Sequence, residues 1–253
     1  MKAMIYAAGL GTRLRPLTDD RPKALVELHG VTMLERVARS LISHGVDEIV
    51  VNIHHFGEKI IEFLRSKDNF GITVHISDER DLLLDTGGGL LRAREYFSEG
   101  NEPFFVHNAD ILTTLDYSAM LREHIHRGCD ATLLVKHRQT QRYLLFDKQD
   151  GSLRGWVNKQ TLQTRPEGVV YAPDKYNEYA FGGVHILTPA IFDRLQRYSE
   201  QIDSTVFSIT PFYLSESVCA SPLSVYGYDS PTPYEWFDIG KPETLALAQQ
   251  ALR

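Results

Sequence analysis

An apolar segment at the N-terminus runs directly into a stretch that contains Gly9 and Gly11. Glycines at the end of a strand let main-chain N–H groups approach a phosphate chain, and the fixed amide dipoles then bind its negative charge. Thr12 adds a hydroxyl donor, while Arg13 and Lys23 add positive charge. The stretch therefore predicts a phosphate-binding loop at the end of the first strand of an α/β fold.

Two common phosphate-binding loops fit this stretch poorly. A dinucleotide-binding fingerprint needs a third glycine where Leu14 stands, and a Walker A loop needs Gly-Lys-Ser/Thr, which does not follow Gly11. The stretch resembles instead the signature of the sugar-1-phosphate nucleotidyltransferases, whose elements occur here as Ala7-Ala8-Gly9, Gly11-Thr12-Arg13-Leu14, Pro16-Leu17-Thr18 and Pro22-Lys23. The resemblance implies that the nucleotide is bound by Ala7, Ala8, Gly9, Gly11, Thr12 and Arg13, with Lys23 and Arg13 also acting in catalysis.

Length and composition predict one soluble domain. The 253 residues contain no repeat, no long flexible linker and no membrane-spanning or signal-peptide pattern. The two cysteines provide neither a disulfide framework nor metal-ligand spacing, so we expect a cytoplasmic protein. The net charge of −6 argues against nucleic-acid and membrane partners, although a local basic cluster still suits an anionic substrate. The sequence does not indicate the oligomeric state.

The order of predicted elements favours a Rossmann-like, mostly parallel sheet with helices on both faces, over residues 1–136. The pattern predicts helices at 31–44, 56–64 and 117–126, and strands at 48–53, 72–76, 103–106 and 131–136. In such sheets ligands bind beyond the carboxyl ends of the strands. Residues 137–253 predict a small antiparallel extension, with a hairpin at 142–146 and 153–157, an exposed excursion at 161–179 and a strand at 180–187.

Three consecutive glycines follow Asp85 and Thr86. We expect residues 85–89 to form a loop before a helix at 90–97, because such a run indicates unusual dihedral angles or close contact with a flat ligand. In the family that this chain resembles, the equivalent segment lies against the nucleotide base, which implies that role for Gly87 and Gly88.

Two aspartates are candidate ligands for Mg²⁺. Asp110 follows a predicted buried strand in His107-Asn108-Ala109-Asp110, and its carboxylate suits a hard cation. The segment 235–243 resembles the closing motif of the family, which implies that Asp238 is the second metal ligand and pairs with Asp110. We also assign Asn108 to nucleotide binding. The nearby histidines lack further ligands at zinc spacing.

The sugar site is less clearly marked, because the family's Glu-Lys-Pro triplet is replaced by Asn158-Lys159-Gln160. We assign sugar-phosphate binding to Asn158, Lys159, Glu178 and Gly182, with Glu178 as a substitute for the missing carboxylate. The segment around Gly182 resembles the small-residue strand of the family.

The resemblance implies Mg²⁺-dependent transfer of a nucleotidyl group from a nucleoside triphosphate to a sugar 1-phosphate. Within the family, the short length and the Thr-Gly-Gly-Gly stretch favour enzymes that use UTP and N-acetylmuramate 1-phosphate, a cell-wall precursor. Guanylyltransferases for mannose or heptose 1-phosphate are the next alternative. A cytidylyltransferase for phosphocholine-like acceptors and a non-catalytic nucleotide-sugar sensor remain open.

Overall fold

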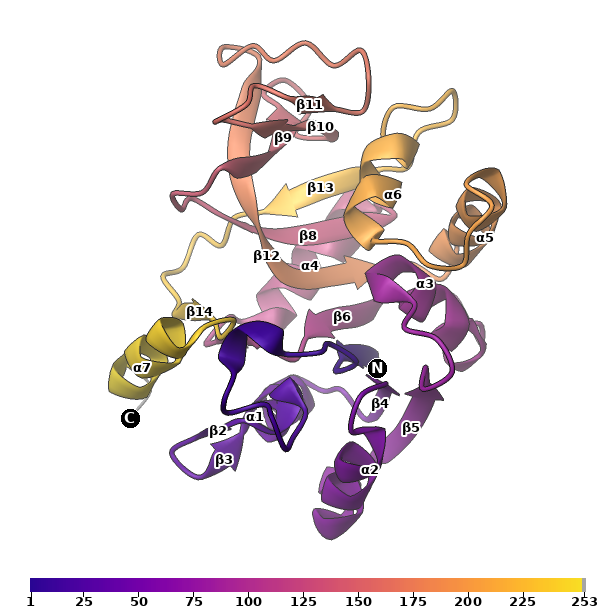
Figure 1. Ribbon diagram of the computed structural model, residues 1–253. Helices are drawn as coiled ribbons and strands as arrows, with labels where there is room; N and C mark the ends of the chain where they lie inside the picture. The colour runs from indigo at the N-terminus through magenta and orange to yellow at the C-terminus, as the bar shows by residue number, and fades with distance from the viewer. Residues whose placement is uncertain (252–253) are drawn as a thin grey trace.

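Four parallel strands form the part of the fold that carries the predicted phosphate-binding loop (Figure 1). The structure is a computed structural model that describes residues 1–251. The four strands lie in the order β6-β1-β4-β5 and run parallel to one another. Their bounds are Lys2–Tyr6 for β1, Glu48–Ile53 for β4, Thr73–Asp78 for β5 and Phe104–Asn108 for β6.

One long strand, β12 (Tyr176–Leu187), joins the parallel strands to the rest of the ten-stranded sheet. Its second half pairs antiparallel with β6 and β8, and its first half pairs antiparallel with β9. Beyond β9 lie β10 and β11, while β13 runs parallel to β8. These strands are β8 (Ala131–Lys136), β9 (Arg142–Asp147), β10 (Leu153–Asn158), β11 (Thr164–Arg165) and β13 (Val225–Tyr228).

Helices cover both faces of the sheet. Met4 and Ile5 are consecutive, fully buried residues of β1 that belong to two separate hydrophobic clusters, as expected for side chains on opposite faces. The Ile5 cluster includes residues of α1 (Met33–Ser43), α2 (Gly57–Ser66), α4 (Tyr117–Arg127) and α7 (Pro242–Ala251). The Met4 cluster includes residues of α3 (Asp85–Arg92), α5 (Ile191–Gln201) and α6 (Ile209–Glu216).

Short elements complete the fold. Two small antiparallel ribbons pair β2 (Glu27–Leu28) with β3 (Val31–Thr32), and β7 (Ile111–Thr113) with β14 (Trp236–Asp238). Single 3-10 turns occupy Thr12–Leu14, Lys23–Leu25, Asp68–Gly71 and Ala93–Tyr96. The longest helices of the described range have 11 residues, and none there combines the length and apolar content that a membrane crossing requires.

The predicted fold class is confirmed, and several elements match the sequence pattern closely. The strands predicted at 48–53 and 131–136 are β4 and β8, and the predicted hairpin is β9 with β10. The helix predicted from Val31 begins at Met33 instead, because Val31 and Thr32 pair in β3 and the Thr32 hydroxyl accepts a hydrogen bond from the Glu35 amide.

The prediction of a loop at residues 85–89 is wrong, because these residues form the first turns of α3. Amides at the start of a helix have no partner within it, and here the amides of Gly87 and Gly88 donate to the carbonyl of Phe207 at 2.8 and 3.1 Å. A β-carbon on Gly88 would overlap the Thr205 carbonyl oxygen. The glycines therefore allow the segment 205–207 to pack closely against the helix.

The excursion predicted at 161–179 is also too long. Residues 176–179 already belong to β12, where they pair with β9, and Thr164 and Arg165 form the edge strand β11. Tyr176 is buried in a small cluster with Leu145 and Val157, which explains why this polar segment joins the sheet. The pattern gave no sign of several further elements, among them β2, β7, α6, β13 and β14.

Three histidines are buried in the interior. His107 bonds to the Tyr117 hydroxyl at 2.8 Å and His185 to the Tyr213 hydroxyl at 2.7 Å. Burial lowers the pKa of His107 to about 4 and that of His185 to about 3. Burial also lowers the pKa of His124 to about 4, against the opposing charge of Asp130. The folded protein therefore holds these rings neutral at pH values where an exposed imidazole becomes protonated.

This burial predicts loss of stability in mild acid. Between an unfolded pKa of about 6.5 and the folded values near 4, the unfolded chain binds more protons, so the free energy of unfolding falls as the pH decreases. His107→Gln removes one such group and is expected to reduce the slope by up to about 1.4 kcal/mol per pH unit in this window. Denaturant unfolding at several pH values measures the slope. The exposed His126→Gln should leave it unchanged, and an equal slope in both variants would contradict the explanation.

Candidate active site

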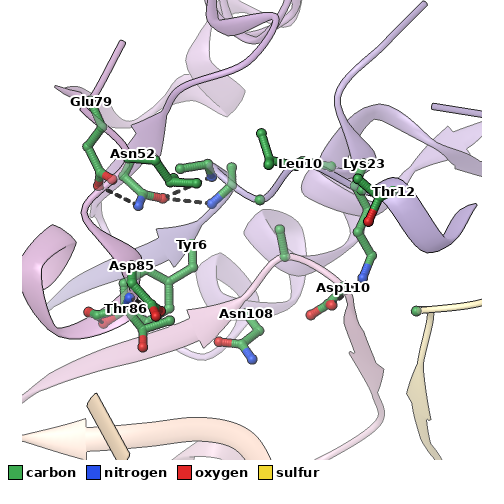
Figure 2. A pocket seen from close by; sticks show the side chains of 18 of the residues that line it. Tyr6, Leu10, Thr12, Lys23, Asn52, Glu79, Asp85, Thr86, Asn108 and Asp110 are labelled. Atoms are coloured by element: carbon green, nitrogen blue, oxygen red, sulfur yellow. Dashed lines mark hydrogen bonds and ion pairs between the residues drawn. The ribbon is translucent and has the colours of Figure 1, made fainter. Parts of the chain in front are cut away.

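A cavity of about 580 Å³ opens at the carboxyl ends of β1 and β6, where the sheet was predicted to bind a ligand. Figure 2 shows its two ends: Lys23, Thr12 and Asp110 lie at one, and Asp85, Thr86 and Glu79 at the other. Most of the predicted nucleotide-binding and catalytic residues line this cavity: Ala7, Ala8, Gly9, Gly11, Thr12, Arg13, Lys23, Asn108 and Asp110.

Gly11 leaves room for Lys23 to lie close to the loop. It has a φ of +67°, in the left-handed region that favours glycine. A β-carbon there would lie 3.0 Å from the Thr18 methyl and 3.1 Å from the Lys23 β-carbon, so glycine allows both side chains to approach. Gly9 differs, because a β-carbon on it would meet no atom of the described chain within 4 Å. Internal packing therefore does not require glycine at position 9, where the loop faces open space.

A buried amide and a buried carboxylate, Asn52 and Glu79, hold the beginning of the loop. The Asn52 Oδ1 atom accepts hydrogen bonds from the amides of Ala7 at 2.7 Å and Ala8 at 3.4 Å. Its Nδ2 atom donates to Glu79 at 2.7 Å, and the other Glu79 oxygen accepts from the Leu84 amide at 3.2 Å. Burial raises the pKa of Glu79, and these two hydrogen bonds oppose that effect. The amides of Ala7 and Ala8 are thus engaged by Asn52.

Sequence reasoning missed both of these residues, although the loops after β4 and β5 were expected to reach the site. Asn52 is the penultimate residue of strand β4, and Glu79 directly follows β5. A polar residue inside an apolar, β-branched strand was the available signal, because a buried amide needs hydrogen-bond partners.

The end of the cavity away from Lys23 is lined by Tyr6, Leu83, Asp85, Thr86 and Val206. The Tyr6 hydroxyl donates to the Thr86 carbonyl at 2.6 Å, which ties β1 to the start of α3. Gly87 and Gly88 do not line the cavity, since their amides bond to Phe207 beneath the helix. They shape this end only indirectly, by allowing α3 to lie against residues 205–207.

The β7–β14 ribbon brings the two predicted metal ligands together. Asp238 pairs with Ile111 in register, and the Ile239 amide donates to the Asp110 carbonyl at 2.8 Å. Lys23 forms an ion pair with the Asp110 carboxylate. A β-carbon on Gly240 would lie 2.8 Å from the Asp238 carboxylate and 3.2 Å from the Arg13 guanidinium, which locates Arg13 beside Asp238. Lys23, Arg13 and Asp110 therefore line one end of the cavity, and the ribbon places Asp238 next to them.

The Asp238 carboxylate has the environment of an incomplete ligand set. Its Oδ1 atom is buried and has no hydrogen-bond partner within residues 1–251. Burial raises the pKa of Asp238 and the charge of Asp110 raises it further, while nearby cations oppose both effects. No group of three or more metal-ligating side chains occurs in the described part of the chain. Mg²⁺ is commonly held by one or two carboxylates together with substrate phosphates, so these residues fit that ion.

The residues assigned to the sugar lie outside the cavity. The Asn158 Oδ1 atom accepts from the amides of Gln160 at 2.9 Å and Thr161 at 3.3 Å, so it caps a turn. Lys159 donates to both Glu178 oxygens at 2.9 Å. Burial raises the pKa of Glu178, but its bonds to Tyr171 and Lys159 outweigh burial and leave the pKa below its usual value.

Gly182 is likewise occupied by protein contacts. A β-carbon there would meet Leu134 at 2.8 Å, and its carbonyl accepts a hydrogen bond from the Trp236 indole at 2.8 Å. The neighbouring Gly183, with a φ of +74°, is the glycine beside Asn108, whose amide nitrogen lies 3.0 Å from the position of a β-carbon. The structure thus places Gly183, one residue further along, at the edge of the candidate site.

This arrangement agrees with the sequence comparison. The profile of the nucleotidyl transferase family matches residues 2–253. The chain belongs to this family. Similar proteins include mannose-1-phosphate guanyltransferase beta-B of Xenopus laevis, which is 29% identical over 96% of this chain and 62% of its own length. The corresponding catalytic subunit beta of Dictyostelium discoideum is 30% identical with the same coverage. The chain thus spans about three fifths of the length of these relatives.

Solved structures share the fold of this family member. HddC from Yersinia pseudotuberculosis, complexed with GMP-PN, has a TM-score of 0.73 and 22% identity, and the match covers 100% of this chain and 99% of that one. A UDP-glucose pyrophosphorylase complexed with UDP-glucose has a TM-score of 0.72 and 19% identity, over 99% and 97% of the two chains.

The hydrogen bonds of Asn52 predict that it supports both the fold and the loop. Asn52→Ala leaves the Ala7 amide and the Glu79 carboxylate without their partner, so the free energy of unfolding should fall by about 2–4 kcal/mol. The affinity for nucleoside triphosphate should weaken as well, because the loop loses its anchor. Denaturant unfolding and calorimetric titration measure the two effects. The exposed Asn177→Ala is the control, and equal behaviour of the two variants would contradict the proposed role.

Proposed function

We propose that this protein transfers a nucleotidyl group from a nucleoside triphosphate to a sugar 1-phosphate and releases pyrophosphate. The observation that carries the proposal is the convergence of Lys23, Arg13 and Asp110 at one end of a cavity lined by the glycine loop, with Asp238 next to them. In the reaction, an oxygen of the acceptor phosphate forms a bond with the α-phosphorus, and the bond from that phosphorus to the β-phosphate oxygen breaks. Pyrophosphate carries the leaving electron pair.

The chain's own residues provide binding, orientation and charge. The free amides of the loop and the Arg13 guanidinium bind the β- and γ-phosphates, and Lys23 faces the α-phosphate. A sugar phosphate is already ionised at neutral pH, so no residue is needed to remove a proton from it. This agrees with a site of cations and carboxylates. Positioning of two anions and neutralisation of their charge account for the catalysis.

Asp110 and Asp238 are the residues that would hold Mg²⁺. The buried, unpartnered Oδ1 atom of Asp238 and the adjacent carboxylate of Asp110 support this assignment. When bound, the ion would neutralise phosphate charge and orient the two substrates. Lys23 already contacts Asp110, so it can neutralise that carboxylate while the site is being filled.

The nucleotide and the sugar are proposed from the relatives. Those named above are guanylyl- or guanyltransferases for mannose 1-phosphate, so we propose GTP and mannose 1-phosphate, or a similar hexose phosphate, as the substrates. The sequence-based expectation of UTP with N-acetylmuramate 1-phosphate finds no support among these relatives, and the guanylyltransferase alternative now becomes the preferred one.

The substrates can be tested by measuring pyrophosphate release with Mg²⁺ for GTP, UTP, CTP and dTTP. Each is combined with mannose, heptose, glucose, N-acetylglucosamine and N-acetylmuramate 1-phosphates, and with phosphocholine. GTP with mannose 1-phosphate should give a kcat/KM about tenfold or more above any pair with UTP. A preference for UTP with N-acetylmuramate 1-phosphate would overturn the assigned base and sugar. Nucleotide binding without release from any pair would indicate a sensor instead.

The carboxylate pair predicts the effect of two neutral variants. Asp110→Asn or Asp238→Asn should lower kcat by about a hundredfold or more, because each loses a negative charge at the metal position. Circular dichroism should show an intact fold, and titration should show weaker Mg²⁺ binding. Asp174→Asn removes the same charge from the exposed surface as a control. Turnover near the wild-type rate in either site variant would exclude the metal assignment.

A further inference from the structure

Two cations at the end of β8, Lys136 and Arg138, pack on the aromatic residues that precede Asp238. The Lys136 ammonium lies 4.1 Å from the centre of the Tyr234 ring and 5.7 Å from that of Trp236. The Arg138 guanidinium lies 5.2 Å from the centre of the Trp236 ring. Within residues 1–251, neither side chain has a carboxylate within 4.0 Å, unlike Lys23 and Lys159.

Lys136 is half-buried, which makes the absence of a carboxylate partner costly. Burial lowers its pKa, and the more distant charges of Glu235 and Asp229 only oppose that effect. Contact with the faces of Tyr234 and Trp236 compensates part of the lost hydration. A half-buried cation held by aromatic rings beside an active site is arranged to receive an anion from solution.

The position of the two cations relative to the reaction indicates which anion they receive. In phosphoryl-type transfer the attacking and leaving oxygens lie roughly in line on opposite sides of the phosphorus. Under the proposed function, pyrophosphate leaves along the loop, where Arg13 lies beside Asp238. The acceptor must therefore enter from the opposite wall, and Figure 2 shows Asn108 and Asp110 across the cavity from Leu10 in the loop.

Neither Lys136 nor Arg138 lines the cavity itself, but a chain of contacts connects that opposite wall to the two cations. Asn108 lies against Gly183, and the carbonyl of the adjacent Gly182 accepts a hydrogen bond from Trp236. Lys136 pairs with Ala180 on β12, two residues before Gly182. Arg138 is also close enough for its charge to act on Asp238. The cations thus stand on the acceptor side of the carboxylate pair, whereas Arg13 and Lys23 stand on the side of the nucleotide phosphates.

We propose that Lys136 and Arg138 bind an anionic group of the acceptor, with Trp236 and Tyr234 holding the two cations in place. This inference rests on the proposed function, because it names the second substrate's binding site in the same reaction. The anionic group is either the 1-phosphate itself or a carboxylate carried by the sugar. In both cases a second pair of cations balances the charge that the acceptor brings to a site already occupied by a triphosphate.

The kinetic test uses Arg138→Gln and Lys136→Met, the second of which retains the apolar stem. In each variant the KM for the acceptor should rise about tenfold or more, while the KM for the nucleotide changes less than about twofold. Arg122→Gln, an exposed residue of α4, removes the same charge as a control. An unchanged KM for both mannose 1-phosphate and N-acetylmuramate 1-phosphate, or a rise in the KM for the nucleotide instead, would overturn the proposal.

The two sources of the anion are separated by comparing mannose 1-phosphate with N-acetylmuramate 1-phosphate, which also carries a carboxylate. An equal rise in KM for both acceptors identifies the phosphate as the bound group. A rise in KM for N-acetylmuramate 1-phosphate alone identifies the carboxylate.

A binding test does not depend on turnover. The chain has two tryptophans, so in Trp156→Phe the fluorescence of Trp236 alone reports on this wall. Titration with mannose 1-phosphate and with N-acetylmuramate 1-phosphate should change that fluorescence, and Arg138→Gln should weaken the binding about tenfold or more. If acceptor changes the Trp236 fluorescence as expected but no turnover occurs, the proposed function is rejected and the acceptor site is supported. If turnover occurs but the acceptor changes the Trp236 fluorescence in neither variant, the acceptor site alone is rejected.

Discussion

The pairing of β7 with β14 is the contact on which the candidate active site depends. It joins residues separated by more than a hundred positions, and it brings Asp238 next to Asp110, which lines one end of the cavity. Two carboxylates repel each other, and burial adds to the cost of charging Asp238. The ribbon therefore holds them together at the expense of electrostatic energy, and Lys23 and Arg13 reduce that cost on the side of the loop.

The positive charge of the cavity lining is confined to one end. Arg13 and Lys23 lie there beside Asp110, whereas the other end is formed by Tyr6, Leu83, Asp85 and Thr86. Between these ends, the buried Asn52 and Glu79 connect the phosphate-binding loop to the backbone before α3. A buried amide and a buried carboxylate that bond to each other and to two chain segments give the loop a fixed geometry, which is what the proposed binding of phosphates without reorganisation requires.

The antiparallel half of the sheet contacts the candidate site through β12. β12 carries Gly183 beside Asn108 and Gly182 against Leu134, and it receives the hydrogen bond of Trp236. Its first half pairs with β9 of the β9–β10 hairpin (Figure 1). Beside this pairing, Lys159, Tyr171 and Glu178 bond to one another. Residues chosen from the sequence for the sugar thus support this part of the sheet, while Lys136 and Arg138 pack on Trp236, two residues before Asp238.

The sequence by itself determined the parallel strands, the helices that cover them, and the loop with Gly9, Gly11 and Lys23, because periodicity and glycine chemistry are local properties. Apart from the proximity of Asp238 to Asp110, which the family resemblance implied, only the tertiary structure decided which distant groups meet. In the folded chain the amides of Gly87 and Gly88 bond to Phe207, and Asn52 bonds to Glu79. Gly183, rather than Gly182, lies beside Asn108. Such contacts depend on packing between segments far apart in the chain, and a pattern that repeats every two or four residues carries no information about them.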